Sequence, residues 1–100
     1  LYTDMMNKCK CPEELIEMYA SHYEGEEFIK VRESGYIKPM IGSNNFANRD
    51  DMEILVNGND ERIIISSRFD NLGKGASGAA IQCMNIALGL DEKTGLNLKE

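Results

Sequence analysis

Residues 73–78 (GKGASG) have types and spacing that could bind a dinucleotide. They match G-x-G-x-x-G, follow an expected strand and open an expected helix, as the pyrophosphate-binding turn of a Rossmann domain does. Such a unit continues with a second parallel strand and an acidic residue for the ribose, and only a short polar stretch follows this helix. The preceding strand also belongs to an expected antiparallel hairpin, which is the wrong topology for that domain.

Two other interpretations of this glycine segment remain open. The glycines can permit a tight entry into the helix and close packing. Alternatively, the loop lies against a cofactor that another domain holds. Backbone N–H groups at a helix start, together with Lys74, suit an anionic or amide ligand.

The three cysteines and the single histidine are the other candidates for chemistry. They show no two-plus-two spacing of ligands, so we predict no metal site. Cys9 and Cys11 lie near the start of a helix, which favours the thiolate, but no base is obviously close. Cys83 falls mid-helix among apolar residues and is expected to be buried and inert. His22 is expected to pack near Tyr19 and Tyr23 rather than to catalyse.

The acidic balance of the chain argues against nucleic acid as a partner. Lys and Arg number 11 against 17 Asp and Glu, which gives a formal charge of −6, whereas a phosphate-binding groove needs clustered cations. We find no apolar run of about 18 residues and no signal-peptide pattern, so we expect no membrane as partner. An odd number of cysteines without such a signal favours a cytoplasmic location.

The hundred residues allow one small domain, 1–100, with the 42% hydrophobic and 28% charged shares of a globular chain. An apolar stripe at four-residue spacing, with Pro12 in its first turn, predicts a helix over 12–23. Residues 1–5 fit the end of a strand and 28–31 a short strand. The glycines and asparagines of 33–45 predict a long ordered loop.

A β-hairpin is expected in the second half of the chain. Strand-like residues 52–56 and 62–67 flank Asn57-Gly58, which readily takes the positive φ angles of a tight turn, and the next two residues lengthen that turn. The isoleucine run at 63–65 predicts that the second strand is covered on both faces. Residues 70–75 are expected to form a second loop.

The final helix, expected at about 76–88, is apolar nearly all round. A helix of this kind is buried on most sides, so we expect another domain or subunit to cover one of its faces. From Asp91 onward we expect a short polar tail. Together the elements predict an α+β fold with a mixed or antiparallel sheet, a β-hairpin and two helices.

Residues 70–82, then Met84-Asn85 and 89–96, resemble the C-terminal signature of N-acetyl-γ-glutamyl-phosphate reductases, enzymes of arginine biosynthesis. The upstream order is also similar, with a helix at 13–23, Phe-x-x-Val at 28–31 and Gly-Ser-Asn at 42–44. Aspartate-semialdehyde dehydrogenases share the Asp-Asn-Leu and Lys-Gly-Ala elements. The Met-Asn pair and the Gly-Leu-Asp-Glu ending favour the arginine enzyme.

The resemblance implies a fragment of a two-domain dehydrogenase. In that group, an N-terminal domain holds NADP, and the last helix of the second domain packs back on it. Hydride passes from NADPH to a thioester on a cysteine, with a histidine as acid/base, and both residues lie upstream of this region. No cysteine or histidine of this chain falls in those motifs, so we assign no catalytic residue.

The resemblance does imply a cofactor-binding role for Asn71, which would face the nicotinamide amide, with Lys74 and Gly75 nearby. The implied partners are the chain's own nucleotide-binding domain and further copies in a homo-oligomer, dimer or tetramer. Two alternatives stay open: the tail of an aspartate-semialdehyde dehydrogenase, and a stand-alone interaction module derived from such a domain.

Overall fold

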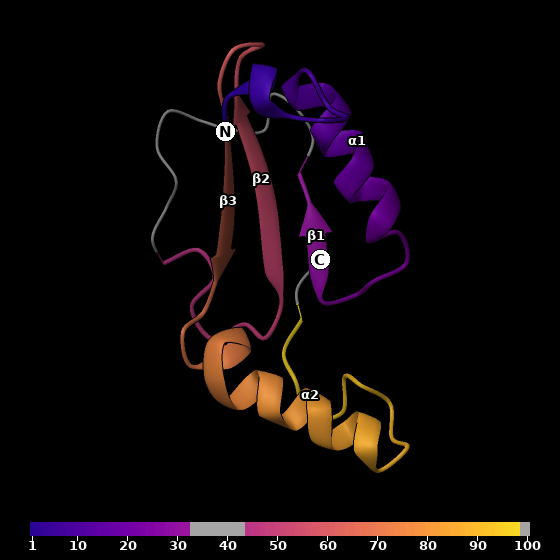
Figure 1. Cartoon of the computed structure of the whole chain (residues 1–100). Helices are drawn as coiled ribbons and strands as arrows, with labels where there is room; N and C mark the ends of the chain where they lie inside the picture. The colour runs from indigo at the N-terminus through magenta and orange to yellow at the C-terminus, as the bar shows by residue number, and fades with distance from the viewer. Residues whose placement is uncertain (33–43, 99–100) are drawn as a thin grey trace.

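The computed structural model describes residues 1–32 and 44–98, and these form an α+β fold as the sequence predicts (Figure 1). The elements in chain order are the 3-10 turn η1 (Thr3–Met5), α1 (Pro12–His22), β1 (Ile29–Val31), β2 (Met52–Gly58), β3 (Ile63–Phe69), the π-helical turn η2 (Gly73–Ser77) and α2 (Gly78–Ala87). α1 packs beside the sheet, whereas α2 lies beyond the ends of the strands (Figure 1). The loop expected at 33–45 falls almost entirely outside the described residues.

The sheet is mixed, as predicted, with the strand order β1-β2-β3. β1 runs parallel to β2, and β2 pairs antiparallel with β3, which confirms the hairpin. The turn, however, lies further along the chain than expected. Asn57 and Gly58 still pair as the end of β2, and the chain reverses over 59–62. There the side-chain oxygen of Asn59 accepts the backbone N–H groups two and three residues on.

The apolar core lies between α1 and the sheet. Its buried members are Cys9, Leu15, Val56 and Ile63, with Met6, Ile16 and Tyr19 packed against them. Pro12 begins α1, where its missing N–H would have had no partner in the helix. The predicted helix at 12–23 is therefore confirmed, and its apolar stripe is the side that faces the strands.

β2, not β3, is the strand that is covered on both faces. Residues 54–56 of β2 are all buried, whereas of the isoleucine run only Ile63 is. Ile64 is 63% exposed and Ile65 37% exposed. The expectation for this run is wrong because β3 is the last strand of the described sheet, so less of the molecule surrounds it.

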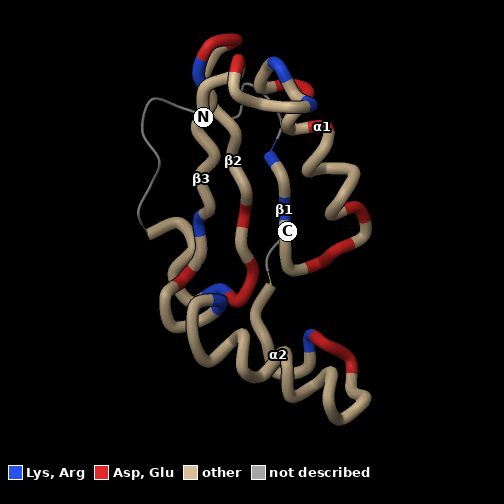
Figure 2. The backbone as a smooth tube through the Cα atoms, in the orientation of Figure 1, with Lys and Arg blue, Asp and Glu red and all other residues tan. Residues whose placement is uncertain are grey.

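α2 buries a polar side chain and exposes apolar ones. Asn85 is 1% exposed, whereas Met84, Ile86 and Leu88 are 51%, 55% and 66% exposed. Figure 2 shows that no charged residue lies along this helix. An exposed apolar surface of this kind is what the sequence leads us to expect for a helix that another body covers. Among the described residues, no helix has the length and apolar character needed to cross a bilayer.

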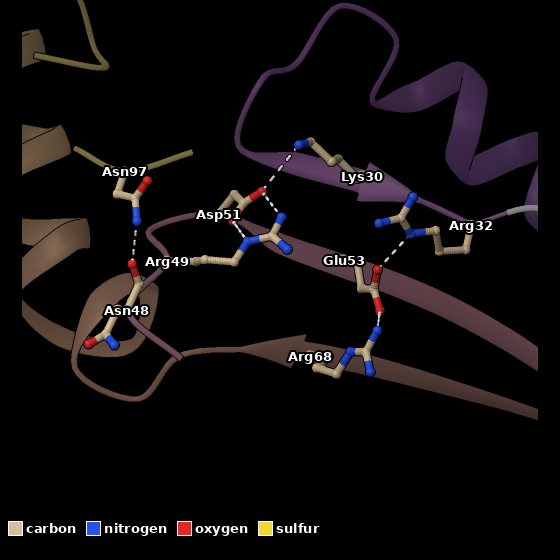
Figure 3. A network of polar contacts seen from close by, with 8 residues as sticks. All are labelled: Lys30, Arg32, Asn48, Arg49, Asp51, Glu53, Arg68 and Asn97. Carbon is tan, nitrogen blue, oxygen red and sulfur yellow. Dashed lines mark hydrogen bonds and ion pairs between the residues drawn. The ribbon is translucent and has the colours of Figure 1, made fainter. Parts of the chain in front are cut away.

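The carboxylate of Asp51, directly before β2, is fully buried and held by two cations (Figure 3). Arg49 donates hydrogen bonds of 2.8 and 2.6 Å to its two oxygens, and Nζ of Lys30 lies 3.3 Å from one of them. Burial opposes ionisation, but these contacts outweigh it, so the pKa of Asp51 lies below its ordinary value. The contacts tie β1 to the segment that leads into β2.

Glu53 is the second fully buried carboxylate, and it joins the two outer strands to the central one (Figure 3). Nε of Arg32, just after β1, donates a 2.6 Å hydrogen bond to one oxygen, and Arg68 of β3 binds the other. The guanidinium groups of Arg49 and Arg68 both lie over the ring of Phe46, 4.0 and 5.1 Å from its centroid. Phe46 thus links the Asp51 and Glu53 clusters.

Replacing Asp51 by Asn keeps the size of the side chain and removes the charge that offsets Arg49 and Lys30. We expect Asp51→Asn to lower the free energy of unfolding at neutral pH by about 3 kcal/mol, as breaking a buried ion pair does. The folded-state pKa is depressed, so the wild-type advantage is complete above the unfolded-state pKa of about 4 and is lost as pH falls through the folded-state value. Urea unfolding at a series of pH values measures both effects.

Glu27→Gln is the matched control. It breaks the ion pair of Glu27 with Lys93 (2.8 Å), whose side chains are 56% and 45% exposed. Solvent screening leaves such a pair little net effect on stability, so we expect little change at any pH. Equal losses in the two variants, or an Asp51→Asn deficit that persists unchanged in acid, would contradict the assignment.

Candidate functional site

The segment between β3 and α2 is a wide helical turn rather than the loop expected at 70–75. The N–H of Gly75 bonds to the carbonyl of Asp70 at 3.0 Å, and that of Gly78 to the carbonyl of Gly73, each five residues back. The N–H of Gly73 donates to the Asp70 side chain at 2.9 Å. Because these N–H groups bond within the chain, they do not form a phosphate cradle. The regular helix consequently begins at Gly78, two residues later than predicted.

Gly73 and Gly78, the first and last glycines of the G-x-G-x-x-G match, are packing residues. A Cβ on Gly73 would collide with the carbonyl oxygen of Arg49 and meet Oδ1 of Asp50 at 2.9 Å. A Cβ on Gly78 would collide with the same carboxylate and lie 2.7 Å from the carbonyl of Gly73. The glycines therefore let the turn rest directly on residues 49–50. The packing interpretation is confirmed, and the antiparallel β2–β3 pair excludes the Rossmann one.

The structure brings Asn71 and Gly75 together. A Cβ on Gly75 would lie 3.6 Å from Oδ1 of Asn71 and 3.2 Å from Cε2 of Phe69. Asn71 is exposed, and Phe69 is 45% exposed. The absence of a side chain at position 75 thus leaves a small exposed surface with an amide and an aromatic ring beside each other.

Lys74, the third predicted cofactor residue, is engaged elsewhere. Its Nζ donates a 2.5 Å hydrogen bond to Oε1 of Gln82 in α2 and lies 5.0 Å from the centroid of the Phe28 ring. These contacts fasten the wide turn to α2 and to the residue before β1. The cofactor role of Asn71, Lys74 and Gly75 stays a prediction. Asn71 lies beside Gly75, whereas the Lys74 side chain is bound to Gln82.

Asn85 explains two parts of the sequence signature that carry no obvious chemistry. Its Nδ2 donates to the carbonyl oxygens of Glu92 and Thr94, at 2.9 and 3.0 Å. Gln82, one turn earlier, donates to the Glu92 side chain at 3.2 Å. Asn85 of the Met-Asn pair therefore contacts Glu92 of the Gly-Leu-Asp-Glu ending, so the structure joins these two parts of the signature. The available signal for this contact was the pair of amides, Gln82 and Asn85, in an otherwise apolar helix.

The described residues after Asp91 are held to the rest of the molecule by hydrogen bonds, which corrects the expectation of a polar tail. The N–H of Asn97 donates to the Asp50 side chain, and the N–H of Asp50 donates to the carbonyl of Asn97, both at 2.8 Å. The Asn97 side chain donates to the carbonyl of Asn48 at 2.6 Å (Figure 3). The segment that supports Gly73 and Gly78 is thus held from its other side by the end of the described chain.

Cys11, directly before α1, does not have the expected thiolate character. The backbone N–H of Glu14 lowers the pKa of Cys11, but burial and the negative charges of Glu14 and Glu13 together outweigh it and raise the pKa. Cys9 is buried, with Sγ 4.0 Å from the sulfur of Met18. Neither sulfur is placed to act as a nucleophile.

Cys83 is exposed, which corrects the expectation that it is buried. His22 is also exposed, but it packs beside a tyrosine of its own helix as expected. Cys83 shares the outward side of α2, and His22 contacts the ring of Tyr23 edge-on, 4.7 Å between centroids. Cys83 and the other two thiols lie at opposite ends of the molecule, on α2 and before α1 (Figure 1). Across residues 1–32 and 44–98, no three Cys, His, Asp or Glu side chains are grouped as metal ligands.

One open pocket lies away from Asn71 and Gly75. It is formed by residues 25–28 and 91–93 and includes four carboxylates and the Glu27–Lys93 ion pair. Its acidic lining would repel an anionic cofactor. We therefore place the candidate site at the Asn71 surface and not in this pocket.

A mixed sheet with this hairpin, followed by the wide turn and an uncovered apolar helix, is an α+β arrangement consistent with a fragment of a dehydrogenase C-terminal domain. Comparison with known proteins gives the particular kind. The chain is 47% identical over 88 residues to the N-acetyl-gamma-glutamyl-phosphate reductase of Methanobrevibacter smithii, and 44% over 85 to that of Methanopyrus kandleri. The identity to the enzyme of the same name from Methanococcus maripaludis is 43% over 86 residues.

These matches cover 85–86% of this chain but 24–25% of each relative, in its C-terminal part. The chain thus spans about a quarter of the length of the curated relatives it matches. No profile of a known protein family matches it. The resemblance seen at residues 70–96 is confirmed: the chain is similar to the C-terminal part of N-acetyl-γ-glutamyl-phosphate reductases.

Gly78→Ala tests the packing role of the glycines. In an ordinary helix this change stabilises by up to about 1 kcal/mol, whereas here overpacking against the Gly73 backbone should destabilise by about 3 kcal/mol. Gly75→Ala is the matched control, because its nearest contact is a looser 3.2 Å and should cost less than about 1 kcal/mol. Urea unfolding ranks the two variants, and a Gly78→Ala protein as stable as wild type would remove this account of the motif.

Proposed function

We propose that the chain is the C-terminal part of an NADP-dependent N-acetyl-γ-glutamyl-phosphate reductase. That enzyme reduces N-acetylglutamyl phosphate to N-acetylglutamate semialdehyde in arginine biosynthesis, in the cytoplasm. The observation that carries the proposal is the 36–47% identity to reductases of this name over 84–91% of the chain.

In this proposal the chain supplies a wall of the active site and not its reacting groups. The nucleophilic cysteine and the acid/base histidine belong to the other three quarters of the enzyme. The described thiols and imidazole agree with that division, since Cys9 lies in the core and Cys83 on the outer side of α2. None of them contacts Asn71.

The Asn71 surface fits the nicotinamide end of NADP, whose dihydro form supplies the hydride. A carboxamide both donates and accepts hydrogen bonds, and so does the exposed amide of Asn71, so the two can pair. Gly75 leaves room beside that amide, and the exposed Phe69 ring offers a flat apolar neighbour. Lys74, bound to Gln82, supports a role in holding the turn in place.

The uncovered faces suit the proposed partners. The outward side of α2 carries Met84, Ile86 and Leu88 and no charge, which suits packing on the enzyme's own nucleotide-binding domain. The sheet would contribute subunit contacts in a homo-oligomer, a dimer or a tetramer. A stand-alone module would instead be a monodisperse monomer with this helix exposed.

The complete enzyme tests the substrate. We expect it to oxidise NADPH with N-acetyl-γ-glutamyl phosphate and not with β-aspartyl phosphate. The reverse preference would indicate an aspartate-semialdehyde dehydrogenase. Activity with neither acyl phosphate would leave the stand-alone module as the better account.

Asn71→Ala in the complete enzyme tests the cofactor wall. Removing hydrogen bonds worth about 1–3 kcal/mol should lower kcat/KM for NADPH roughly tenfold to a hundredfold, with unchanged thermal stability. Asn7→Ala is the matched control, because Asn7 is also exposed and lies near α1, far from the wide turn. Steady-state kinetics at varied NADPH measures both, and identical constants for wild type and Asn71→Ala would remove Asn71 from the site.

A further inference from the structure

The first residues of the chain pair with the outer edge of β3. The nitrogen of Leu1 donates to the carbonyl of Ile63 at 2.6 Å, and the N–H of Ile63 donates back to the carbonyl of Leu1 at 2.8 Å. The N–H of Thr3 donates to the carbonyl of Glu61 at 3.0 Å, and Tyr2 and Arg62 form an antiparallel bridge. This is the alternation of an antiparallel ladder, so residues 1–3, which end at the start of η1, pair in the antiparallel sense with 61–63.

The same edge continues beyond Ile63 for the rest of β3. Only alternate residues of β3 direct their backbone N–H and C=O groups to β2. The 2.9 Å bond from the Asn59 N–H to the Arg62 carbonyl shows that Arg62 belongs to this set. The N–H and C=O groups of Ile63, Ile65 and Ser67 therefore point to the outer edge. Of these, Ile63 is paired with Leu1, and among residues 1–32 and 44–98 no strand pairs with the other two.

We propose that, in the complete reductase, the residues directly before Leu1 form a further strand antiparallel to β3. This rests on the proposed function, since the relatives are about four times as long as the matched part. Continuing the observed register pairs the residue two positions before Leu1 with Ile65, and the residue four positions before it with Ser67. The strand would cover the edge beside Ile64 and Ile65, which are 63% and 37% exposed.

Within the described part of the chain this edge, rich in isoleucine, is unpaired beyond Ile63, and such an edge is a template for pairing with another chain unless it is covered. A second copy could in principle supply the cover. The preceding segment is the better occupant because Leu1 and Thr3 already pair with residues 61–63 in the required register. The chain before Leu1 therefore starts next to the open edge. Antiparallel continuation requires only that the chain stay extended.

Disulfide trapping in the complete protein tests the register. Non-hydrogen-bonded antiparallel pairs have Cα atoms about 4.5 Å apart, which a disulfide can span. In the proposed register Ser66 faces the residue three positions before Leu1 in such a pair. With cysteines at these two positions, we expect an intramolecular disulfide under mild oxidation, as in the positive control Tyr2→Cys with Arg62→Cys.

The matched negative control moves the upstream cysteine one position, to four before Leu1, which turns it to the opposite face of the strand. If the positive control forms its disulfide and the Ser66 pair does not, the proposal is overturned. A Ser66 disulfide found only between two copies overturns it as well. If the double variant fails to fold, amide exchange of the unaltered complete protein decides. The Ile65 and Ser67 amides should exchange at least about a hundredfold more slowly than in an open strand, and fast exchange overturns the proposal.

These readouts do not depend on activity. A trapped disulfide in a protein that reduces neither acyl phosphate would support the strand and refute the proposed function. An active reductase without the disulfide would do the reverse.

Discussion

The two buried carboxylates impose the constraint on which the rest of the structure depends. A carboxylate removed from water is stable only where cations and hydrogen bonds replace its hydration, and removing one partner leaves an uncompensated charge. Asp51 and Glu53 meet that condition by drawing side chains from β1, from β3 and from the segment before β2. Among the described residues the sheet has three strands, and this polar layer stabilises one of its faces as the apolar core under α1 stabilises the other.

The candidate site depends on the same polar layer through backbone contacts. The Arg49–Asp51 pair fixes residues 49–50, on which Gly73 and Gly78 rest, and Asn97 holds them from the other side. The wide turn is thereby set in place, and Asn71 with it. The Asn71 amide is therefore positioned indirectly, by contacts between other residues of the molecule.

Patterns local in the sequence gave reliable expectations. The stripe at 12–23 and the Asn57-Gly58 turn signal led to α1 and to the hairpin, and the apolar composition of 76–88 to an uncovered helix. Features that depend on distant contacts were not predictable. Position 73 requires glycine because a side chain there would collide with the Arg49 backbone. Ile64 is exposed because β3 lies at the edge of the described sheet. The hydrophobic periodicity of the sequence reveals neither feature.

The attachment of α2 bears on how the molecule opens. The helix contacts the wide turn, the segment 91–97 and, at Gly78, Asp50, while α1 and the three strands share a separate core. Local unfolding is least costly where little apolar surface is buried, so α2 with its Asn85 contact forms one cooperative unit and the sheet with α1 another. A body that bound the outer side of α2 would slow the opening of the first unit and leave the second almost unaffected.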